Sequence, residues 1–354
     1  MSKLLGTFVI TILILVWGTL ALVADAIAQP ETRALAVESY MIPSGGPDIE
    51  LFVRNKRPKD MTSFRDDRIV LYVHGSTQAA EATFDLALEG MSWMDDLARN
   101  GWDVWLMEMR GFGRSTKPPE MDQPAGNNPP IAPATLAMRD LATVIDHIRQ
   151  RRGVSRISLI GWSRGTALIG MYAEQNAGNI HRLVMYGQNW IRGSSTTAGP
   201  PAPIGAYQTW TPAEARTRLQ AGSPADARDS LMPPHWVAAW SAAVLATDPV
   251  GAARKPPVVR TPAGTVQDGR DTWQAGKAAF DPSRINAPTL VITGEWDGVN
   301  PPALARGMFA KLTNAPFRRF TEVGEATHFM MVEKNRHQLF GQTRFFLEED
   351  FSRR

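Results

Sequence analysis

A serine between two glycines is the residue of this 354-residue sequence that is best placed to act as a nucleophile. It is Ser163, in the motif Gly-Trp-Ser-Arg-Gly at 161–165, between the apolar run 157–160 and a predicted helix over 166–174. A serine on a sharp turn from strand to helix presents its hydroxyl above the sheet, and larger flanking side chains would collide with the neighbouring strand and helix. The pattern G-x-S-x-G is common by chance, yet this context favours a nucleophile over an ordinary glycine-rich turn.

Such a serine needs two further residues, because its hydroxyl is a weak nucleophile without a histidine base and an orienting carboxylate. The predicted strand 289–293 is followed by a loop that contains Glu295 and Asp297. Catalytic groups of open parallel sheets gather at such strand ends, so we take Asp297 as the acid, with Glu295 as its competitor. His328 follows the next predicted strand, 317–323, in a loop before the last helix, and is the fitting base.

The other five histidines suit that role less well. Four lie in predicted helices, at the start of a strand or in the insertion described below: His147, His181, His235 and His337. His74 ends the predicted strand 68–73, where we expect it to brace the loop rather than to transfer protons. Because that loop should supply one donor to an oxyanion, we assign the backbone N–H groups of Ser76 and Arg164 to the oxyanion hole. Two preorganised donors would lower the barrier by about 3 kcal/mol each.

Short apolar runs that alternate with helical segments must position these residues. The predicted buried strands are 68–73, 103–107, 157–160, 183–186 and 289–293. The clearest helix is 136–151, where Leu141, Val144 and Ile148 share one face. Segments 37–41 and 49–53 predict an antiparallel hairpin before this alternation. The repetition implies right-handed crossovers and a mostly parallel sheet covered by helices on both faces.

Two proline-rich segments interrupt this alternation. Residues 117–133 hold six prolines and predict a long loop. Residues 190–282 hold twelve of the 26 prolines, with predicted helices at 212–220 and 233–246, and we expect this insertion to form a lid. The chain is therefore divided into a signal peptide or anchor (1–28), the first part of the core (29–189), a lid or cap insertion (190–285) and the second part of the core (286–354).

The order of Ser163, Asp297 and His328 along the chain resembles that of the α/β-hydrolase superfamily, and the match extends over nearly all of 38–349. The resemblance includes His-Gly at 74–75 and the turn Glu-Met-Arg-Gly-Phe-Gly-Arg-Ser at 108–115, which is similar to the family's D-x-R-G-x-G-x-S turn with Glu in place of Asp. It implies an α/β-hydrolase fold. A serine at 163 points to esterases, lipases and lactonases, whereas the dehalogenases and epoxide hydrolases of this fold carry Asp there.

From these residues together we predict cleavage of a medium-sized, largely apolar carboxylic ester or lactone through an acyl-enzyme. No cofactor or metal is expected, because the chain has neither an H-E-x-x-H pair nor a P-loop. An acyltransferase or a perhydrolase would use the same three residues and differ in what enters the pocket. An alternative of another class is a catalytically silent binding protein on the same fold. The oligomeric state stays open.

Large apolar side chains near these residues predict a medium-sized, largely apolar pocket. They lie beside the nucleophile, the acid and the base or in the insertion, and are Trp162, Trp190, Trp236, Trp240, Trp296, Phe329 and Met330. For each of them core packing is the more common role, and Trp236 with Trp240 would form one buried stripe of a helix.

The composition narrows the class of protein further. With 44% hydrophobic and 21% charged residues, the chain has the composition of a globular protein, not of a disordered or collagen-like one. The net charge of +3 comes without long runs of like charge, so no nucleic-acid partner is indicated. The absence of cysteine excludes disulfides and thiolate metal sites.

The N-terminus has the pattern of a targeting segment. Lys3 precedes the uncharged stretch 4–24, and Ala-Asp-Ala-Ile-Ala at 24–28 offers two overlapping A-x-A cleavage sites. We predict a signal peptide cleaved after Ala28, with an uncleaved membrane anchor as the alternative. Both place the rest of the chain outside the cytoplasm, so we expect a periplasmic or secreted protein that contacts a membrane only through an uncleaved segment.

Overall fold

The computed structural model describes residues 33–46, 48–192 and 202–351. The predicted signal peptide or anchor, 1–28, lies outside these residues, and the structure does not test it. The described residues from Leu35 onward form one unit. Within the described residues, no helix combines the length and the apolar character that a bilayer span requires.

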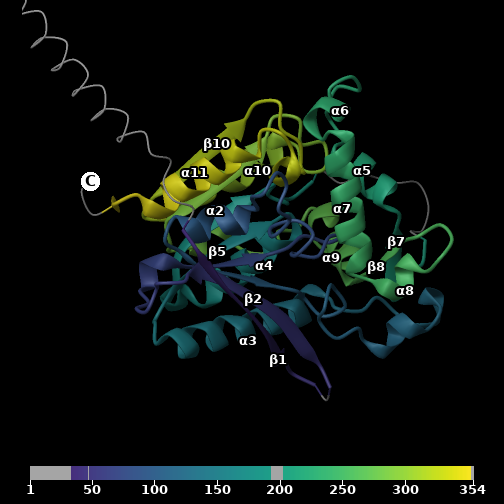
Figure 1. The fold of residues 1–354 in the computed structure, drawn as a ribbon, viewed down its shortest axis with the longest axis horizontal. Helices are drawn as coiled ribbons and strands as arrows, with labels where there is room; N and C mark the ends of the chain where they lie inside the picture. The colour runs from purple at the N-terminus through teal and green to yellow at the C-terminus, as the bar shows by residue number, and fades with distance from the viewer. Residues whose placement is uncertain (1–32, 47, 193–201, 352–354) are drawn as a thin grey trace, which may run out of the picture. The chain divides into compact units, whose positions relative to one another are not determined.

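In the described part of the chain, eight strands form one sheet (Figure 1). In spatial order they are β1 (Leu35–Pro43), β2 (Glu50–Pro58), β4 (Asp103–Met107), β3 (Ile69–Val73), β5 (Ile157–Trp162), β6 (Ile180–Tyr186), β9 (Thr289–Gly294) and β10 (Arg318–Val323). The pairs β1–β2 and β2–β4 are antiparallel, and all other neighbours in this sheet are parallel. The predicted mostly parallel sheet with an antiparallel lead-in hairpin is therefore confirmed.

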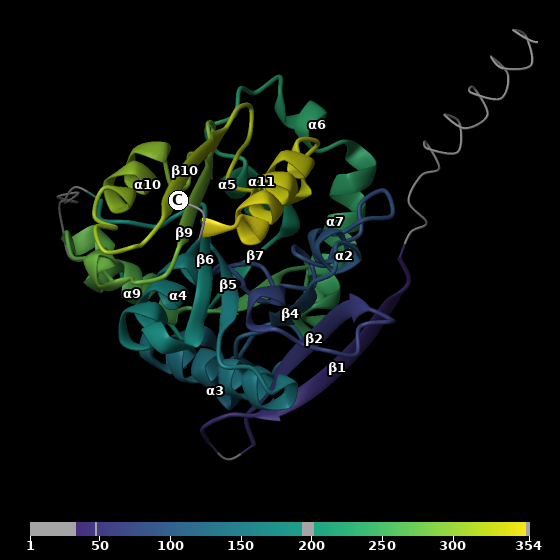
Figure 2. The same cartoon turned by 90° about the vertical axis from the view of Figure 1, so that its left-hand side faces the viewer.

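Helices cover both faces of this sheet, as the apolar, two-sided strands require. Figure 2 shows α3 (Ala134–Arg152), α4 (Arg164–Gln175) and α10 (Pro302–Phe309) on one side. The helices α2 (Trp93–Arg99) and α11 (Arg336–Glu348) lie on the other side. The buried side chains form two large clusters, one on each face, because successive residues of a strand point to opposite faces.

The segment between β6 and β9 contains its own small elements, which Figure 1 shows together beside the sheet. They are β7 (Tyr207–Trp210), α5 (Pro212–Leu219), α6 (Arg228–Leu231), α7 (Pro234–Ala246), α8 (Pro249–Ala252), β8 (Val259–Pro262) and α9 (Gly264–Asp271). The strands β7 and β8 pair antiparallel with each other. Helix α5 begins with a capping box, in which Thr211 accepts from the Glu214 N–H and Glu214 accepts from the Thr211 N–H.

The other proline-rich segment, 117–133, forms the predicted loop. Its regular structure is limited to two short 3₁₀ turns, Pro119–Asp122 and Ala125–Asn127. The loop ends at Pro133, directly before α3. It lies against the insertion, because the Ile131 N–H donates to Ala206 O (3.3 Å) and the Gly264 N–H donates to Ile131 O (2.8 Å).

Candidate active site

Ser163 lies on the sharp turn between β5 and α4. Its φ of 55° and ψ of −118° are a rare combination for a residue with a side chain. A Cβ on Gly161 would lie 2.7 Å from the Gly165 carbonyl carbon, and a Cβ on Gly165 would lie 2.2 Å from Val73 O. Both glycines are therefore required by close backbone approach, which explains the motif found in the sequence.

The structure brings Asp297 and His328 together at the ends of β9 and β10. His328 Nδ1–H donates to Asp297 Oδ2 over 2.7 Å, and both side chains are fully buried. The second oxygen of Asp297 accepts from the Asn300 N–H (2.7 Å). The competing acid, Glu295, is exposed and instead accepts from the Glu325 N–H (2.9 Å). Only Asp297 of the two acids can therefore orient the histidine.

The other ring nitrogen of His328 is buried and has no hydrogen-bond partner among the described residues. Buried polar atoms without partners are rare in native structures and ask for an explanation. The His328 carbonyl is held by two donors, Trp162 Nε1 (3.0 Å) and the Tyr186 hydroxyl (2.8 Å). Trp162 is also the residue before Ser163, and its ring centroid lies 5.5 Å from that of His328. His328 is thus fixed beside the serine turn with one nitrogen left to accept a proton.

Gly187, at the end of β6, makes room for this pair. A Cβ there would lie 2.9 Å from His328 Cε1 and 3.0 Å from Nδ1. Its φ of +60° also favours glycine. Asn300 Nδ2 donates to the Gly187 carbonyl (2.9 Å), so Asn300 ties this residue to Asp297. In the sequence Gly187 directly follows the predicted strand 183–186, and no motif indicates this role.

A buried carboxyl group, Glu333, anchors the loop that carries His328. It accepts from the Thr327 hydroxyl (2.6 Å) and the Thr327 N–H (3.1 Å). Gln220, which follows α5, donates to it from Nε2 (3.0 Å). Burial raises the pKa of Glu333 in spite of these donors. Glu333 therefore links the histidine loop to the insertion, and no sequence motif marked it.

His74 has a different environment. Its Nδ1–H donates to Gly75 O (2.8 Å), and its Nε2 accepts from the Met109 N–H (3.0 Å). Complete burial lowers its pKa to about 3, so the ring is neutral with both nitrogens occupied. This geometry agrees with the predicted bracing of the loop after β3.

Glu108, where the resembling family usually has Asp, is also fully buried. Its two oxygens accept from the N–H groups of Ala80 and Glu81, both at 3.0 Å. Burial raises its pKa to about 7. A Cβ on Gly113 would lie 2.6 Å from Glu108 Cδ, so the longer acid fills the space against this glycine.

The two residues assigned to the oxyanion hole, Ser76 and Arg164, line the same cavity as Ser163. Arg164 is the first residue of α4, so its N–H belongs to the first turn, which has no intrahelical acceptor. Its side chain points elsewhere and donates to Ala132 O (2.8 Å) and to Asp268 Oδ2 (3.2 Å).

The cavity at Ser163 has a volume of about 450 Å³ and is more polar than the sequence suggested. Its walls include Asn189, Arg192, Gln208, Trp210, Arg218, Trp273, Gln274 and Asn300. Two of the tryptophans that the sequence did not single out, Trp210 and Trp273, are therefore its aromatic walls.

None of the seven side chains predicted to contact substrate is among the described residues that line this cavity. Five of them are buried in the core cluster on the α2 and α11 face: Trp162, Trp236, Trp240, Phe329 and Met330. Trp190 packs against Phe280, and Trp296 is half-buried. The physical reason is direction: nearness in sequence to Ser163 or His328 does not turn a side chain towards the same face.

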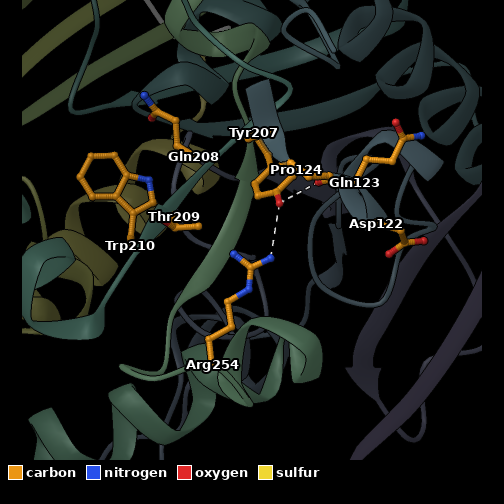
Figure 3. Close-up of a pocket in the computed structure, with 9 residues that line it drawn as sticks. Asp122, Gln123, Pro124, Tyr207, Gln208, Thr209, Trp210 and Arg254 are labelled. Carbon is orange, nitrogen blue, oxygen red and sulfur yellow. Dashed lines mark hydrogen bonds between the residues drawn. The ribbon is translucent and has the colours of Figure 1, made fainter. Parts of the chain in front are cut away.

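A larger cavity, of about 760 Å³, adjoins this one but contains none of the three candidate catalytic residues. Figure 3 shows its lining, with Gln208 and Trp210 on one side and Asp122 and Gln123 on the other. Arg254 donates to the Tyr207 hydroxyl (3.4 Å) across it. Gln208 and Trp210 line both cavities, so β7 forms the wall between them.

The described residues contain no group of three or more His, Cys, Asp or Glu side chains that would hold a metal ion. The arrangement offers a serine on a strained turn, which lines the cavity together with Ser76 and Arg164, and a buried His–Asp pair beside that turn. This is the set of groups that acyl transfer through a serine requires.

Comparison with known proteins places the chain in a fold family. The alpha/beta hydrolase fold family matches residues 68–335, more than half of the chain. An esterase from Thermogutta terrifontis is 18% identical, with a TM-score of 0.55 over 88% of this chain and 98% of that chain. The enol-lactonase from Burkholderia xenovorans is 16% identical, with a TM-score of 0.58 over 87% of this chain and 100% of that chain.

An esterase from Exiguobacterium antarcticum is similar in the same way, at 15% identity and a TM-score of 0.57 over 88% of this chain and 100% of that chain. No match was found among curated proteins. At these identities the solved structures show a shared fold only. With the match to the family over 68–335, the chain belongs to the α/β-hydrolase fold family.

Proposed function

We propose that this protein is a serine hydrolase that cleaves carboxylic esters, lactones included, through an acyl-enzyme on Ser163. The observation that carries the proposal is the state of His328: its Nδ1–H is held by Asp297, while its buried Nε2 has no partner among the described residues. An imidazole whose Nδ1 is held by a carboxylate and whose Nε2 is unoccupied has the arrangement of the base that a serine nucleophile needs.

In the first half-reaction the Ser163 oxygen attacks the ester carbonyl carbon, and His328 Nε2 takes the hydroxyl proton. The resulting oxyanion is stabilised by the N–H groups of Ser76 and Arg164 and by the N-terminus of α4. Asp297 stabilises the imidazolium and stays ionised. The C–O bond to the leaving alcohol then breaks, the alcohol takes the proton from His328, and an acyl-serine ester remains.

In the second half-reaction a water molecule attacks the acyl carbon while His328 takes one of its protons. The bond to the Ser163 oxygen breaks, the serine regains its proton from His328, and a carboxylic acid leaves. All proton transfers use one nitrogen, which agrees with the single unpartnered ring atom of His328. A cavity of about 450 Å³ suits a medium-sized ester.

The test is hydrolysis of p-nitrophenyl esters of graded acyl length by the full chain and by Ser163→Ala. We expect hydrolysis by the parent and a loss of several orders of magnitude in the variant. The variant Ser158→Ala, on the same strand, is the matched control and should keep the parent's rate because Ser158 is buried away from the cavity lining.

Equal rates in the parent and in Ser163→Ala would overturn the proposal. Activity that falls equally in Ser158→Ala would mean that the loss reflects damage to the strand and not removal of the nucleophile. The acyl-length optimum of the parent would measure how much of the cavity the acyl group occupies.

A further inference from the structure

The cavity at Ser163 carries an excess of positive charge. Among its described lining residues are three arginines, Arg164, Arg192 and Arg218, and no Asp or Glu. The stretch 193–201, which follows Arg192 in the sequence, contains no acidic residue either. Protein cavities that concentrate one sign of charge attract ligands of the opposite sign.

Arg164 is not the source of the excess, because it is paired with Asp268 (3.2 Å). Arg218 differs: within the described residues its guanidinium has no hydrogen bond or ion pair, and its carbon lies 5.8 Å from the centre of the Trp210 ring. Burial and the nearby Arg192 lower the pKa of Arg218, which means that its charge is held here at a cost.

Arg192 has partners on one side only. Its Nη2 donates to the Val299 carbonyl and to Asn300 Oδ1 (2.7 Å), whereas its Nε is buried without a partner among the described residues. Asp297 acts on both arginines and partly offsets the lowering of their pKa values. That carboxylate is already bound to His328, so it does not neutralise them as an ion-pair partner would.

The end of α5, the helix that carries Arg218, is bonded to the loops of Asp297 and His328. Directly after α5, which carries Arg218, the Ala221 carbonyl accepts from the Gly298 N–H (2.7 Å), next to Asp297. Gln220 donates to Glu333 (3.0 Å), which anchors the His328 loop. A cation on a helix that is already held in place binds a ligand with a smaller loss of conformational entropy.

We propose that the substrate of this site carries a carboxylate, which Arg218 and Arg192 bind while Ser163 attacks an ester carbonyl elsewhere in the same molecule. The planar guanidinium fork matches the two oxygens of a carboxylate. Trp210 and Trp273 would enclose the carbon chain between the two ends. The inference rests on the proposed function and narrows its substrate class to half-esters of dicarboxylic acids and to lactones that bear a carboxylate.

The test uses two probes that differ in one charge: the mono-p-nitrophenyl ester of adipic acid and the same compound with its free carboxylate methylated. We expect kcat/KM of the parent to be about 10- to 100-fold higher for the anionic probe, the range of a hydrogen-bonded charge pair. Arg218→Gln should remove most of this preference and leave the neutral probe within about 3-fold of the parent. Arg218→Lys should keep part of it, because the charge remains but the fork is lost.

The matched control is Arg139→Gln, on α3. Arg139 is exposed and does not line the cavity, so this change removes one charge and should leave the ratio of the two probes unchanged. A parent that hydrolyses both probes equally would overturn the proposal. A loss in Arg218→Gln that is the same for both probes would also overturn it, because it would assign Arg218 a structural role.

A binding measurement separates this inference from the hydrolase proposal. Titration of adipate and of its neutral diamide into Ser163→Ala needs no turnover. We expect adipate to bind at least about 10-fold more tightly than the diamide, and we expect Arg218→Gln to abolish this difference. This result would support the anion site even if no ester is cleaved. Equal binding of the two compounds contradicts the anion site even if esters are cleaved.

Discussion

Two histidines end up buried at the same edge of the sheet, one in the loop after β3 and one in the loop after β10. His74 uses both ring nitrogens within its own surroundings, on Gly75 O and the Met109 N–H. His328 uses only Nδ1, on Asp297, and keeps Nε2 unpartnered among the described residues. The two histidines are alike in burial and in their position at the end of a strand. They differ in whether the second ring nitrogen has a partner, and this difference distinguishes a bracing residue from a candidate base.

The comparison also shows how the two loops are stabilised. The His74 loop is held by the histidine itself, and Glu108 beside it binds the N–H groups of Ala80 and Glu81. The His328 loop is held by other groups, namely Glu333 on Thr327 and the donors on the His328 carbonyl. A ring that has to accept a proton must be positioned without use of the accepting nitrogen.

The largest expected effect distinguishes the two histidines directly. His328→Ala should lower kcat/KM for a p-nitrophenyl ester by about 10⁴- to 10⁶-fold, because the serine loses its base. His74→Gln should lower it by about 10-fold or less, since only the loop that holds Ser76 is disturbed. Steady-state hydrolysis of one ester by both variants checks this, and losses of equal size would remove the distinction.

A smaller loss of activity is expected when His328 is kept but the carboxylate that orients it is removed. Asp297→Asn should lower kcat by about 10⁴-fold, because the amide favours the tautomer with the proton on Nε2. Glu295→Gln is the matched control and should leave kcat unchanged, since the exposed Glu295 side chain accepts from the Glu325 N–H and, among the described residues, from no group of the candidate site. An Asp297→Asn variant as active as the parent would show that this pair has no catalytic role.

A single added methyl group at Gly187 should displace the ring of His328 from Asp297. Gly187→Ala would place a Cβ 2.9 Å from His328 Cε1, which must then move away from its present position. We expect a loss in kcat of about 100-fold, the size that a displacement of about 1 Å produces. Gly178→Ala, where a Cβ meets no atom within 4 Å, is the control. Full activity in Gly187→Ala would mean that the histidine position is not critical.

The smallest effect concerns stability and belongs to His74. Its pKa in the folded protein is about 3, against an ordinary value of 6.5, so below pH 6.5 the unfolded chain binds a proton that the folded chain does not. The stabilisation is complete above pH 6.5 and is lost as the pH falls towards 3. Through His74 alone, the free energy of unfolding should therefore decrease by about 2 kcal/mol from pH 7 to pH 5.

Urea unfolding of the parent and of His74→Gln at these two pH values measures this contribution. The decrease from pH 7 to pH 5 should be smaller in the variant by about 2 kcal/mol. Other histidines, such as the half-buried His181 with a pKa of about 4, contribute equally to both proteins, so their contributions cancel. The same decrease in both proteins would show that His74 does not hold its neutral form.

The strands of the sheet were predictable because strands that are buried on both faces consist of continuous apolar residues. The run 103–107 matches β4 to the residue. The small strands β7 and β8 were not predicted, since Tyr207–Trp210 and Val259–Pro262 are short and their pairing depends on residues about fifty positions apart. The short helix α2 was also missed, although its capping box, Ser92 with Asp95, is visible in the sequence.

The candidate catalytic residues were predictable because motif, strand order and loop position constrain them together. The cavity walls were not. Trp162 is the neighbour of Ser163 in sequence, yet its ring stacks on Tyr186 and Phe329 in the core. Arg218 and Trp210 reach the cavity only through the packing of the insertion on the loops of Asp297 and His328. The positions of the candidate catalytic residues, which local geometry fixes, were therefore predictable from the sequence, and the walls of the cavity, which long-range packing fixes, were not.

The most direct test of the central claim is covalent labelling of the full chain with an alkyl fluorophosphonate, followed by mass spectrometry of the peptides. The serine oxygen would form a bond to phosphorus as fluoride leaves, which requires a serine activated by a base. We predict one adduct per chain, on Ser163, formed much more slowly in His328→Ala and at an unchanged rate in His235→Ala. No adduct, or an adduct that persists in Ser163→Ala, would contradict the assignment of Ser163 as the nucleophile.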